Sequence, residues 1–562
     1  MLKSGFSNIL VALFCLLLTM PLAHAQDRRA STLAGKSTVY APNGVIATSH
    51  PLASTAGLAV LQEGGNAIDA AVTAAVVLNL VEPHASGIGG DMFAILWSAE
   101  EQKLIGLNAS GRAGSLMTRE EMLRRGHDRI PFRGAEPITV PGALSGWVAL
   151  LERHGTISLA RAFEPAIQLA KDGFPVSPII AKQWAAEVEI LKQDVGASAT
   201  FLIDGERAPR EGEWYRNPDF AHSLQMIVDQ GPEVFYGGEL GAQIVDRVKA
   251  LGGFLTLDDL KNHRAEWVEP VSVPFRGYRL WELPPNGQGI AALEMLRILE
   301  PYDFEGMGHN SASYLHHLIE AKKIAFADLA QYVGDPDYMT VSTGDLLADT
   351  FIESRREKLN PNLAAEHQDP GEIVTGGDTI YLAAADQFGN MISFINSIYW
   401  EFGSGVVVPG TGFVLQDRGA GFTLKEGLAN TLAPGKRPFH TIIPPFVTRT
   451  GADGSEEPWL SYGVMGGSMQ PQAHVQVLLN IVVFGMDLQE AIDAPRFRHQ
   501  SGNRVALEAP ISAEVRSTLT SMGHVIVDES TVSFGGAQAI MRLDQGWAAA
   551  SDPRKDGMAV AH

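Results

Sequence analysis

Cysteine is nearly absent from the sequence: Cys15 is the single one in 562 residues. It lies in an N-terminal segment with the features of a secretory signal, which has a lysine near its start, an apolar run over 9–20 and a small-x-small triplet at 23–25. The apolar run is shorter than the about 20 residues of a transmembrane helix, and an uncleaved membrane anchor is the alternative. We expect residues 1–25 to be removed as a signal peptide, which leaves a mature chain without cysteine. Disulfides, thiol catalysis and cysteine metal sites are thereby excluded.

Positive charge is also scarce. Lysine and arginine number 43 against 64 aspartate and glutamate residues, so the formal net charge is −21, and −22 once Lys3 leaves with the signal peptide. This balance argues against nucleic acid or an anionic membrane surface as a partner. Hydrophobic residues make up 45% of the chain, and the apolar run between Asn66 and Val81 predicts a central buried helix capped by Asn66. The composition predicts an exported, periplasmic or secreted, globular protein with no membrane contact beyond the signal peptide.

Motifs for common cofactors are absent as well. The glycine loop at 87–91, Gly-Ile-Gly-Gly-Asp, lacks a Gly-Lys-Ser/Thr ending and a G-x-G-x-x-G pattern, so it does not indicate a nucleotide site. His316 and His317 are adjacent on a predicted helix over 312–331, where they point about 100° apart and cannot share a metal ion. We interpret both histidines as structural and expect neither a metal nor another cofactor.

The most informative stretch is Gly376-Gly377-Asp378 with the apolar run over 379–385 that follows it. A turn signal before an apolar run predicts a buried strand, and a second run over 391–398 predicts a hairpin. Thr379 is the first residue of this strand. If the Asp378–Thr379 bond were cut, Thr379 would carry both a hydroxyl nucleophile and its own α-amine base. The alternative is an ordinary threonine, since threonine favours strands.

Two other segments suggest groups that bind negative charge. Arg112 is the single charge in a small and polar loop at 106–112, and arginine holds a carboxylate through two parallel hydrogen bonds. The alternative is a surface arginine in a turn. Gly466 and Gly467 precede a predicted helix over 472–484, where glycine N–H groups can form an oxyanion hole. An ordinary turn between a strand and a helix is the alternative there.

Together with further segments, these features resemble the γ-glutamyltranspeptidase family of N-terminal-nucleophile hydrolases. The resemblance extends over residues 41–558, nearly the whole mature chain. Its segments occur in the family's order: Gly64–Val72, Val81–Gly90, Thr139–Gly142, Glu164–Ile167, Gly173–Val176, Phe326–Asp328, Gly334–Pro336, Lys436–Pro438, Ala494–Phe497 and Ser551–Arg554.

The resemblance implies an α+β fold, an αββα four-layer sandwich, made as one precursor that cuts itself before a threonine. The cleaved bond would be Asp378–Thr379. The products would be a large chain over 26–378 and a small chain over 379–562, which stay together as a heterodimer.

The resemblance also implies roles for individual residues. Thr379 matches the nucleophile, and Ser397 occupies the position of a hydroxyl that supports it, where threonine is usual. Gly466 and Gly467 match the oxyanion glycines. Transpeptidases of the family hold the α-carboxylate of glutamate with an arginine and paired serines, and its α-amine with an aspartate.

The departures from the family pattern concern the substrate. Arg112 lies two residues later than a gap-free alignment predicts, and His440 and Thr441 replace the paired serines. Gly421 occupies the position of the amine-binding aspartate, and Arg418 stands where glutamine is common. Losing an acid and gaining an arginine makes a pocket that favours an anionic group without a cationic amine. The candidate substrate-binding residues are therefore Arg112, Arg418, His440 and Thr441.

These departures resemble a divergent, acylase-like branch of the family. We predict a self-processing, exported amidohydrolase or acyltransferase that cleaves γ-glutamyl or glutaryl-like amides through an acyl-threonine intermediate. Its substrate would be a small-molecule amide bearing a carboxylate. The alternatives are a standard glutathione hydrolase or γ-glutamyl transpeptidase, and a non-catalytic exported binding protein on the same fold.

Overall fold

The computed structural model of the chain describes residues 36–366, 379–451 and 454–562. The predicted signal peptide over 1–25 and Asp378, the residue before the predicted cut, lie outside the described residues. Within the described ranges, no helix combines the length and the apolar character needed to cross a membrane.

Two antiparallel sheets of seven strands each form the centre of the described fold. The first sheet has the order β19 (Met558–Ala561), β2 (Val45–Thr48), β10 (Ile380–Ala385), β11 (Met391–Ser397), β3 (Asp91–Ser98), β4 (Lys103–Ala109) and β7 (Glu266–Val268). The second has the order β1 (Val39–Ala41), β18 (Trp547–Ser551), β17 (Ala537–Arg542), β13 (Glu456–Val464), β12 (Phe446–Thr450), β9 (Tyr278–Glu282) and β8 (Val271–Phe275). The predicted hairpin is therefore β10 and β11, at the middle of the first sheet.

The apolar run of β10 is continuous because both of its faces are buried. One face of β10 carries Ile380, Leu382 and Ala384, which pack into a core that this sheet shares with helices such as α3 (Ala67–Val81). Tyr381 and Ala383 alternate with them and pack into a separate core together with residues of the second sheet. Successive strand residues point to opposite faces, so the strand contributes to two hydrophobic layers at once.

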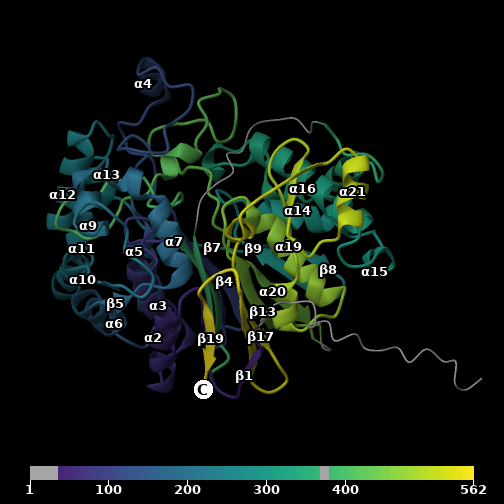
Figure 1. The fold of residues 1–562 in the computed structure, drawn as a ribbon, viewed down its shortest axis with the longest axis horizontal. Helices are drawn as coiled ribbons and strands as arrows, with labels where there is room; N and C mark the ends of the chain where they lie inside the picture. The colour runs from purple at the N-terminus through teal and green to yellow at the C-terminus, as the bar shows by residue number, and fades with distance from the viewer. Residues whose placement is uncertain (1–35, 367–378, 452–453) are drawn as a thin grey trace, which may run out of the picture. The chain divides into compact units, whose positions relative to one another are not determined.

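Helices cover the outer face of each sheet, and Figure 1 shows one group on either side of the strands. The first sheet packs against α2 (Pro51–Gln62), α3 (Ala67–Val81) and α5 (Ala143–His154), with α6 (Leu159–Asp172) packed on α3 and α10 (Pro218–Gln230) packed on α6. The second packs against α14 (Gly289–Leu299) and α19 (Met469–Val482), with α16 (Ala312–Tyr332) packed on α14. The predicted αββα sandwich is confirmed. The helix predicted after Asn66 is α3, and the Asn66 side chain caps it by accepting hydrogen bonds from Ile68 and Asp69 N–H.

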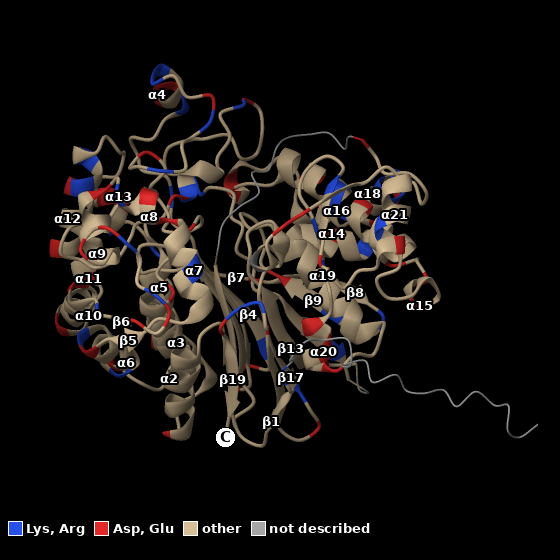
Figure 2. Ribbon diagram, in the orientation of Figure 1, with Lys and Arg blue, Asp and Glu red and all other residues tan. Residues whose placement is uncertain are grey.

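Shorter elements complete the described fold. Beside the first group lie α4 (Arg119–Arg124), α7 (Pro178–Ala186), α8 (Val188–Leu191), α9 (Val195–Phe201), α11 (Glu233–Tyr236), α12 (Glu239–Ala250), α13 (Leu257–Lys261), β5 (Phe174–Pro175) and β6 (Trp214–Tyr215). Beside the second lie α15 (Phe304–Met307), α17 (Thr343–Leu346), α18 (Asp349–Arg356), α20 (Leu488–Asp493), α21 (Ala513–Ser521), β14 (Phe497–His499), β15 (Arg504–Leu507) and β16 (Val525–Val527). In Figure 2 the charged residues gather on helices and loops, whereas the strands of the two sheets are mostly uncharged.

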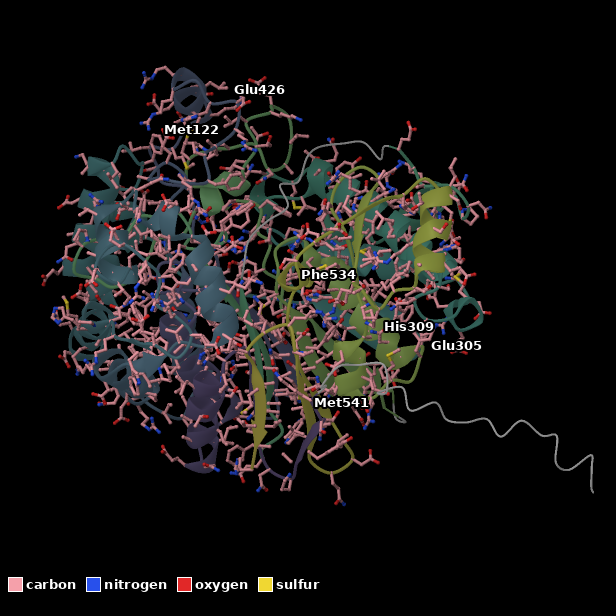
Figure 3. All side chains as sticks on the ribbon, viewed as in Figure 1. Met122, Glu305, His309, Glu426, Phe534 and Met541 are labelled. Atoms are coloured by element: carbon pink, nitrogen blue, oxygen red, sulfur yellow. The ribbon has the colours of Figure 1, made fainter. Side chains whose placement is uncertain are left out.

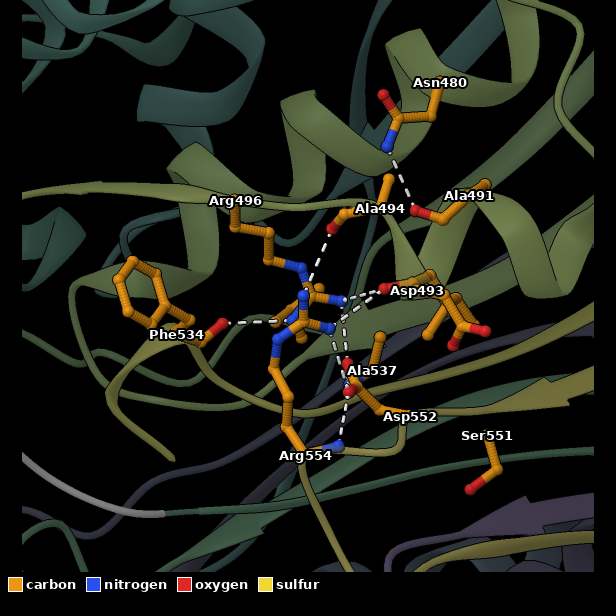
Figure 4. A network of polar contacts seen from close by, with 12 residues as sticks. Asn480, Ala491, Asp493, Ala494, Arg496, Phe534, Ala537, Ser551, Asp552 and Arg554 are labelled. Carbon is orange, nitrogen blue, oxygen red and sulfur yellow. Dashed lines mark hydrogen bonds and ion pairs between the residues drawn. The ribbon is translucent and has the colours of Figure 1, made fainter. Parts of the chain in front are cut away.

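A buried ion-pair network accounts for two of the family-like segments, 494–497 and 551–554 (Figure 4). Asp552 pairs with Arg496 at 2.7 Å and with Arg554 at 3.1 Å, and Arg554 also pairs with Glu508. Two guanidinium groups thus meet two carboxylates, which balances charge that would be costly to bury unpaired. These residues hold the chain after β18 against α20, so their role is structural.

A small hydrophobic cluster packs the loops next to the sheets, and we call it the Tyr399 cluster. Its buried members are Ala113, Met117, Met122, Ile130, Phe254, Tyr399, Ala420, Phe422, Leu424 and Leu432. Met122, labelled in Figure 3, belongs to it and comes from α4. The segment that contains Tyr399 and the segment around Ala420 therefore pack into the same hydrophobic cluster.

Candidate active site

The register of the first sheet brings Thr379 and Ser397 together. Ile380 is paired with Asn396 across β10 and β11, so the next position places Thr379 opposite Ser397. The Thr379 hydroxyl donates a hydrogen bond to Ser397 Oγ at 3.2 Å, and the Thr379 residue is only 1% exposed. Ser397 Oγ also accepts one from the backbone N–H of Tyr399 at 2.9 Å. The two hydroxyls that the sequence singled out are neighbours.

The second sheet closely approaches the strand that begins after Thr379. Tyr381 points toward that sheet, and Thr379 lies two positions earlier on the same face of its strand. Gly463 on β13 packs on the Tyr381 ring, since a Cβ at position 463 would lie 2.4 Å from ring atom Cε2. Gly466 and Gly467 follow this contact directly. The glycine turn thus comes from the sheet opposite Thr379.

Gly466 and Gly467 form a left-handed turn between β13 and α19. Their φ angles are +117° and +58°, a region that glycine adopts without strain. Their carbonyls accept hydrogen bonds from the N–H groups of Met469 and Gln470. This explains why α19 begins at Met469, before the predicted start at 472. Within the described ranges neither glycine N–H donates a hydrogen bond, so both are available to an anion.

Gln288 joins the glycine turn to the segment that contains His440 and Thr441. Its side-chain Nε2 donates to Gly467 O at 2.8 Å and to Thr441 O at 2.5 Å, and its backbone N–H donates to His440 O. Both acceptors of the side chain are carbonyls, so the amide nitrogen must be the group that faces them. Gln288 is not predictable as a site residue, because a glutamine in a Pro-Pro-Asn-Gly-Gln-Gly turn gives no sign of a distant partner.

We expect Gln288→Met to lower kcat about 10-fold, equivalent to about 1.4 kcal/mol, because both side-chain hydrogen bonds are lost at similar volume. Gln476→Met is the matched control, since Gln476 is also buried and its Nε2 also donates to two carbonyls, Gln472 O and Phe497 O. Steady-state kinetics on the two processed variants measures the difference. Equal losses in the two would show that Gln288 is only a packing residue.

His440 is held in one tautomer by its neighbours. Its Nε2 lies 3.0 Å from Asp91 Oδ2 and donates to it, while Nδ1 accepts a hydrogen bond from the Ile442 N–H. Burial lowers the pKa of His440 to about 4, so the ring is neutral at neutral pH. Both ring nitrogens have protein partners, and His440 therefore positions the adjacent Thr441 instead of offering an unpaired nitrogen to a substrate.

Asp91 holds the loops next to Ser397, and it is a residue that the sequence motifs did not assign to the site. It is paired with Ser397 across β3 and β11, which puts both side chains on the same face of the sheet. Its Oδ1 accepts from the backbone N–H groups of Gly111 and Gly142. The available signal was an acid at the end of a glycine loop, directly before a buried strand.

Arg112 is engaged with protein carboxylates. Its Nη1 lies 3.2 Å from Asp335 Oδ2 and its Nη2 lies 3.4 Å from Glu266 Oε1, while Arg437 pairs with the same glutamate. Among the described residues, its guanidinium contacts neither Thr379 nor Arg418. The charge of Arg112 is balanced within the protein.

Arg418, in contrast, is buried without an ion pair among the described residues. It is fully shielded from solvent, and its Nη1 donates to Thr441 Oγ1 at 2.7 Å. Its Cζ lies 4.4 Å from the centre of the Tyr399 ring. Nε and Nη2 have no hydrogen-bond partner in the described part of the chain. Burial lowers the pKa of Arg418 to about 10, which still leaves the group charged at neutral pH.

The carboxylates near Arg418, Asp91 and Asp417, raise its pKa through their charge, but among the described residues neither forms an ion pair with it. Burial raises the pKa of the neighbouring Asp417 to about 7, and Asp417 Oδ1 accepts a hydrogen bond from the Trp400 N–H. Gly421, at the position where the family pattern has an aspartate, brings no carboxylate, and its carbonyl accepts from Asn430 Nδ2. A buried guanidinium without a directly paired carboxylate favours a negatively charged ligand.

His316 belongs to a buried cluster with Glu320 and His524. His316 Nδ1 lies 2.9 Å from His524 Nε2, and His316 Nε2 donates to Asn360 O. The Glu320 carboxylate is paired with Lys323 at 2.7 Å, so its charge is already compensated. We interpret this cluster as a polar network that ties α16 to the chain before β16.

Comparison with known proteins identifies the family. The γ-glutamyltranspeptidase family matches residues 53–562. The chain belongs to this family. It is thus an enzyme of the N-terminal-nucleophile hydrolase class, and the non-catalytic alternative is set aside.

Several relatives lie in the acylase-like branch of the γ-glutamyltranspeptidase family. The glutathione hydrolase-like YwrD proenzyme of Bacillus subtilis is 37% identical over 527 residues, with 92% of this chain and 98% of that protein covered. The oxamate amidohydrolase proenzyme of Klebsiella pneumoniae is 36% identical over 535 residues, with the same coverage of 92% and 98%. The crystal structure of cephalosporin acylase from Bacillus halodurans has a TM-score of 0.88 and 42% identity, with 95% of this chain and 98% of that chain covered.

Proposed function

We propose that this γ-glutamyltranspeptidase-family enzyme is a self-processing amidohydrolase with Thr379 as nucleophile. In the precursor the Thr379 hydroxyl attacks the carbonyl carbon of Asp378, and cleavage frees the Thr379 α-amine. The amine, with a reference pKa of about 7.7–8.0, then takes the hydroxyl proton when Thr379 attacks a substrate amide. The bond from Thr379 to Ser397 and the names of the relatives, which are proenzymes, support this proposal.

The oxyanion that forms on the attacked carbonyl would be stabilised by the N–H groups of Gly466 and Gly467. The amine leaves with the proton, and the acyl group stays on Thr379 as an ester. Water then attacks this ester, which releases the acid and restores the hydroxyl. No cofactor is needed for these steps, because a hydroxyl, an amine and backbone donors are sufficient.

The substrate would be an amide whose acyl group carries a second carboxylate and no α-amine. The observation that carries this proposal is Arg418, a buried guanidinium without an ion pair in the described residues and hydrogen-bonded to Thr441. Gly421 supplies no acid for an α-amine. Among the similar proteins, one is named an oxamate amidohydrolase and another a cephalosporin acylase, in line with acyl groups of this kind.

Hydrolysis of two anilides that differ in the α-amine alone tests this proposal. We expect kcat/KM for glutaryl anilide to exceed that for γ-glutamyl anilide, because the ammonium group would face Arg418 without an acid partner. Addition of a dipeptide acceptor is expected to give little transfer product. A clear preference for the γ-glutamyl compound would instead favour a standard glutathione hydrolase or transpeptidase, which the YwrD-like relative's name makes the second candidate.

We further propose that the protein is exported to the periplasm or secreted, with residues 1–25 removed. The mature enzyme would then be a heterodimer of chains 26–378 and 379–562. The basis is the N-terminal signal pattern and the position of Thr379 directly before β10. An intact mass spectrum of the purified protein reads both cuts at once, and a large chain that retains the first 25 residues would refute export by cleavage.

A further inference from the structure

The guanidinium of Arg418 has one edge in use and one edge vacant among the described residues. Nη1 is committed to Thr441 Oγ1, while Nε and Nη2 have no partner. In a planar guanidinium Nε–H and the adjacent Nη2–H are parallel, and they match the two oxygens of a carboxylate. The vacant edge therefore fits a planar, bidentate anion better than a single acceptor.

The face of the same guanidinium is covered by Tyr399. The Tyr399 ring centre lies 4.4 Å from Arg418 Cζ, a distance typical of a cation–π contact. The ring is only 4% exposed and belongs to the Tyr399 cluster, with Phe132 at 6.3 Å between ring centres. With the ring on one side and Thr441 at one edge, the plane of the guanidinium is fixed.

The backbone of Tyr399 is in an unusual conformation. Its φ is +83°, which is rare for a bulky residue and typical of functional sites where the surrounding structure imposes it. Its N–H donates to Ser397 Oγ, the atom that also accepts from the Thr379 hydroxyl. One residue thus contacts the group beside the nucleophile through its backbone and Arg418 through its ring.

We propose that Tyr399 is the positioning residue that holds Arg418 for side-on, bidentate binding of the substrate carboxylate by Nε and Nη2. This inference rests on the proposed function, and it adds the binding mode and the residue that sets it. The backbone bond to Ser397 and the ring contact fix the spacing between the nucleophile and the carboxylate site. The enzyme would therefore select amides by the length of their acyl group. The distance from the amide carbon to the second carboxylate must match the distance from the Thr379 hydroxyl to Arg418.

Binding of glutarate to the processed enzyme, measured by calorimetry, tests the proposal without turnover. Tyr399→Phe keeps the aromatic face, whereas Tyr399→Leu removes it. We expect Tyr399→Leu to weaken glutarate binding about 10-fold, in the range of a desolvated cation–π contact, and Tyr399→Phe to bind like the wild type. Arg418→Lys keeps the charge without the fork and is expected to weaken binding by at least as much.

The kinetic counterpart separates positioning from general damage. For glutaryl anilide, Tyr399→Leu should raise KM, and its loss in kcat/KM should be larger than for the anilide of glutaric acid monomethyl ester, which has no free carboxylate for Arg418. Equal effects on both anilides, a loss of glutarate binding in Tyr399→Phe as large as in Tyr399→Leu, or glutarate binding by Arg418→Lys as tight as in the wild type would overturn the proposal, and so would no glutarate binding at all. Failure of the proposed function looks different: glutarate binds in the expected order of variants, but neither anilide is hydrolysed.

Discussion

Replacing Thr379 by alanine is expected to leave the protein as one uncut chain and to lower amide hydrolysis by on the order of 10⁴–10⁶-fold. Both effects have the same cause, since in the proposed mechanism the hydroxyl that attacks the Asp378 carbonyl also attacks the substrate. The Thr379 hydroxyl is buried beside Ser397, so water cannot readily take its place at the required position. Denaturing electrophoresis and intact mass measure the cut, and an anilide assay measures turnover.

Two variants control this experiment. Thr379→Ser keeps a hydroxyl and is expected to cut itself, more slowly because serine's side chain is less constrained at χ1. Thr55→Ala removes a threonine hydroxyl that donates a hydrogen bond to Pro51 O at the surface of α2, and should behave like the wild type. A Thr379→Ala protein that still splits would assign cleavage to another group, and a wild type that remains one band would rule out self-processing.

The hairpin could be predicted from the sequence because it depends on local pattern, whereas the place of Ser397 beside Thr379 was implied by the family resemblance. A turn signal between two apolar runs fixes the register of a hairpin, and the register alone places residue 379 opposite 397. The buried helix α3 was predictable for the same reason, since its composition and its Asn66 cap are local. Elements of this kind need no knowledge of the rest of the chain.

The contacts between distant segments could not be predicted from local sequence patterns. Gln288 lies 179 positions from Gly467, and Asp91 lies 349 from His440, so no pattern of the sequence joins them. Arg112 also has a distant partner that the sequence does not indicate. A lone arginine in a polar loop predicts a ligand site, and the fold in addition brings Asp335 to Arg112 from 223 positions away. Burial and pairing, which decide whether an arginine can receive a ligand, are properties of the tertiary structure.

Gly466→Ala is expected to lower kcat by about 10²–10³-fold, the typical cost of losing one oxyanion donor. The φ of Gly466 is +117°, which a residue with a Cβ does not adopt without strain. Space is not the obstacle, because the nearest atoms, Gly535 Cα and Met469 Cβ, would lie 3.4 Å from the added Cβ. The backbone must therefore rotate, and this rotation turns the N–H groups of the glycine turn away from the attacked carbonyl. KM is expected to change little, since the oxyanion exists only in the transition state.

Gly485→Ala provides the matched control for this prediction. Gly485 also has a positive φ, +62°, and an added Cβ there would meet no atom within 4 Å. It follows α19, the helix that the glycine turn begins, but contributes nothing to the turn itself. Both variants should lose some thermal stability from backbone strain, whereas only Gly466→Ala should lose kcat per processed molecule. If kcat fell by the same small factor in both variants, stabilisation of the oxyanion would have to come from groups other than Gly466 and Gly467. The turn would then serve only to connect β13 with α19.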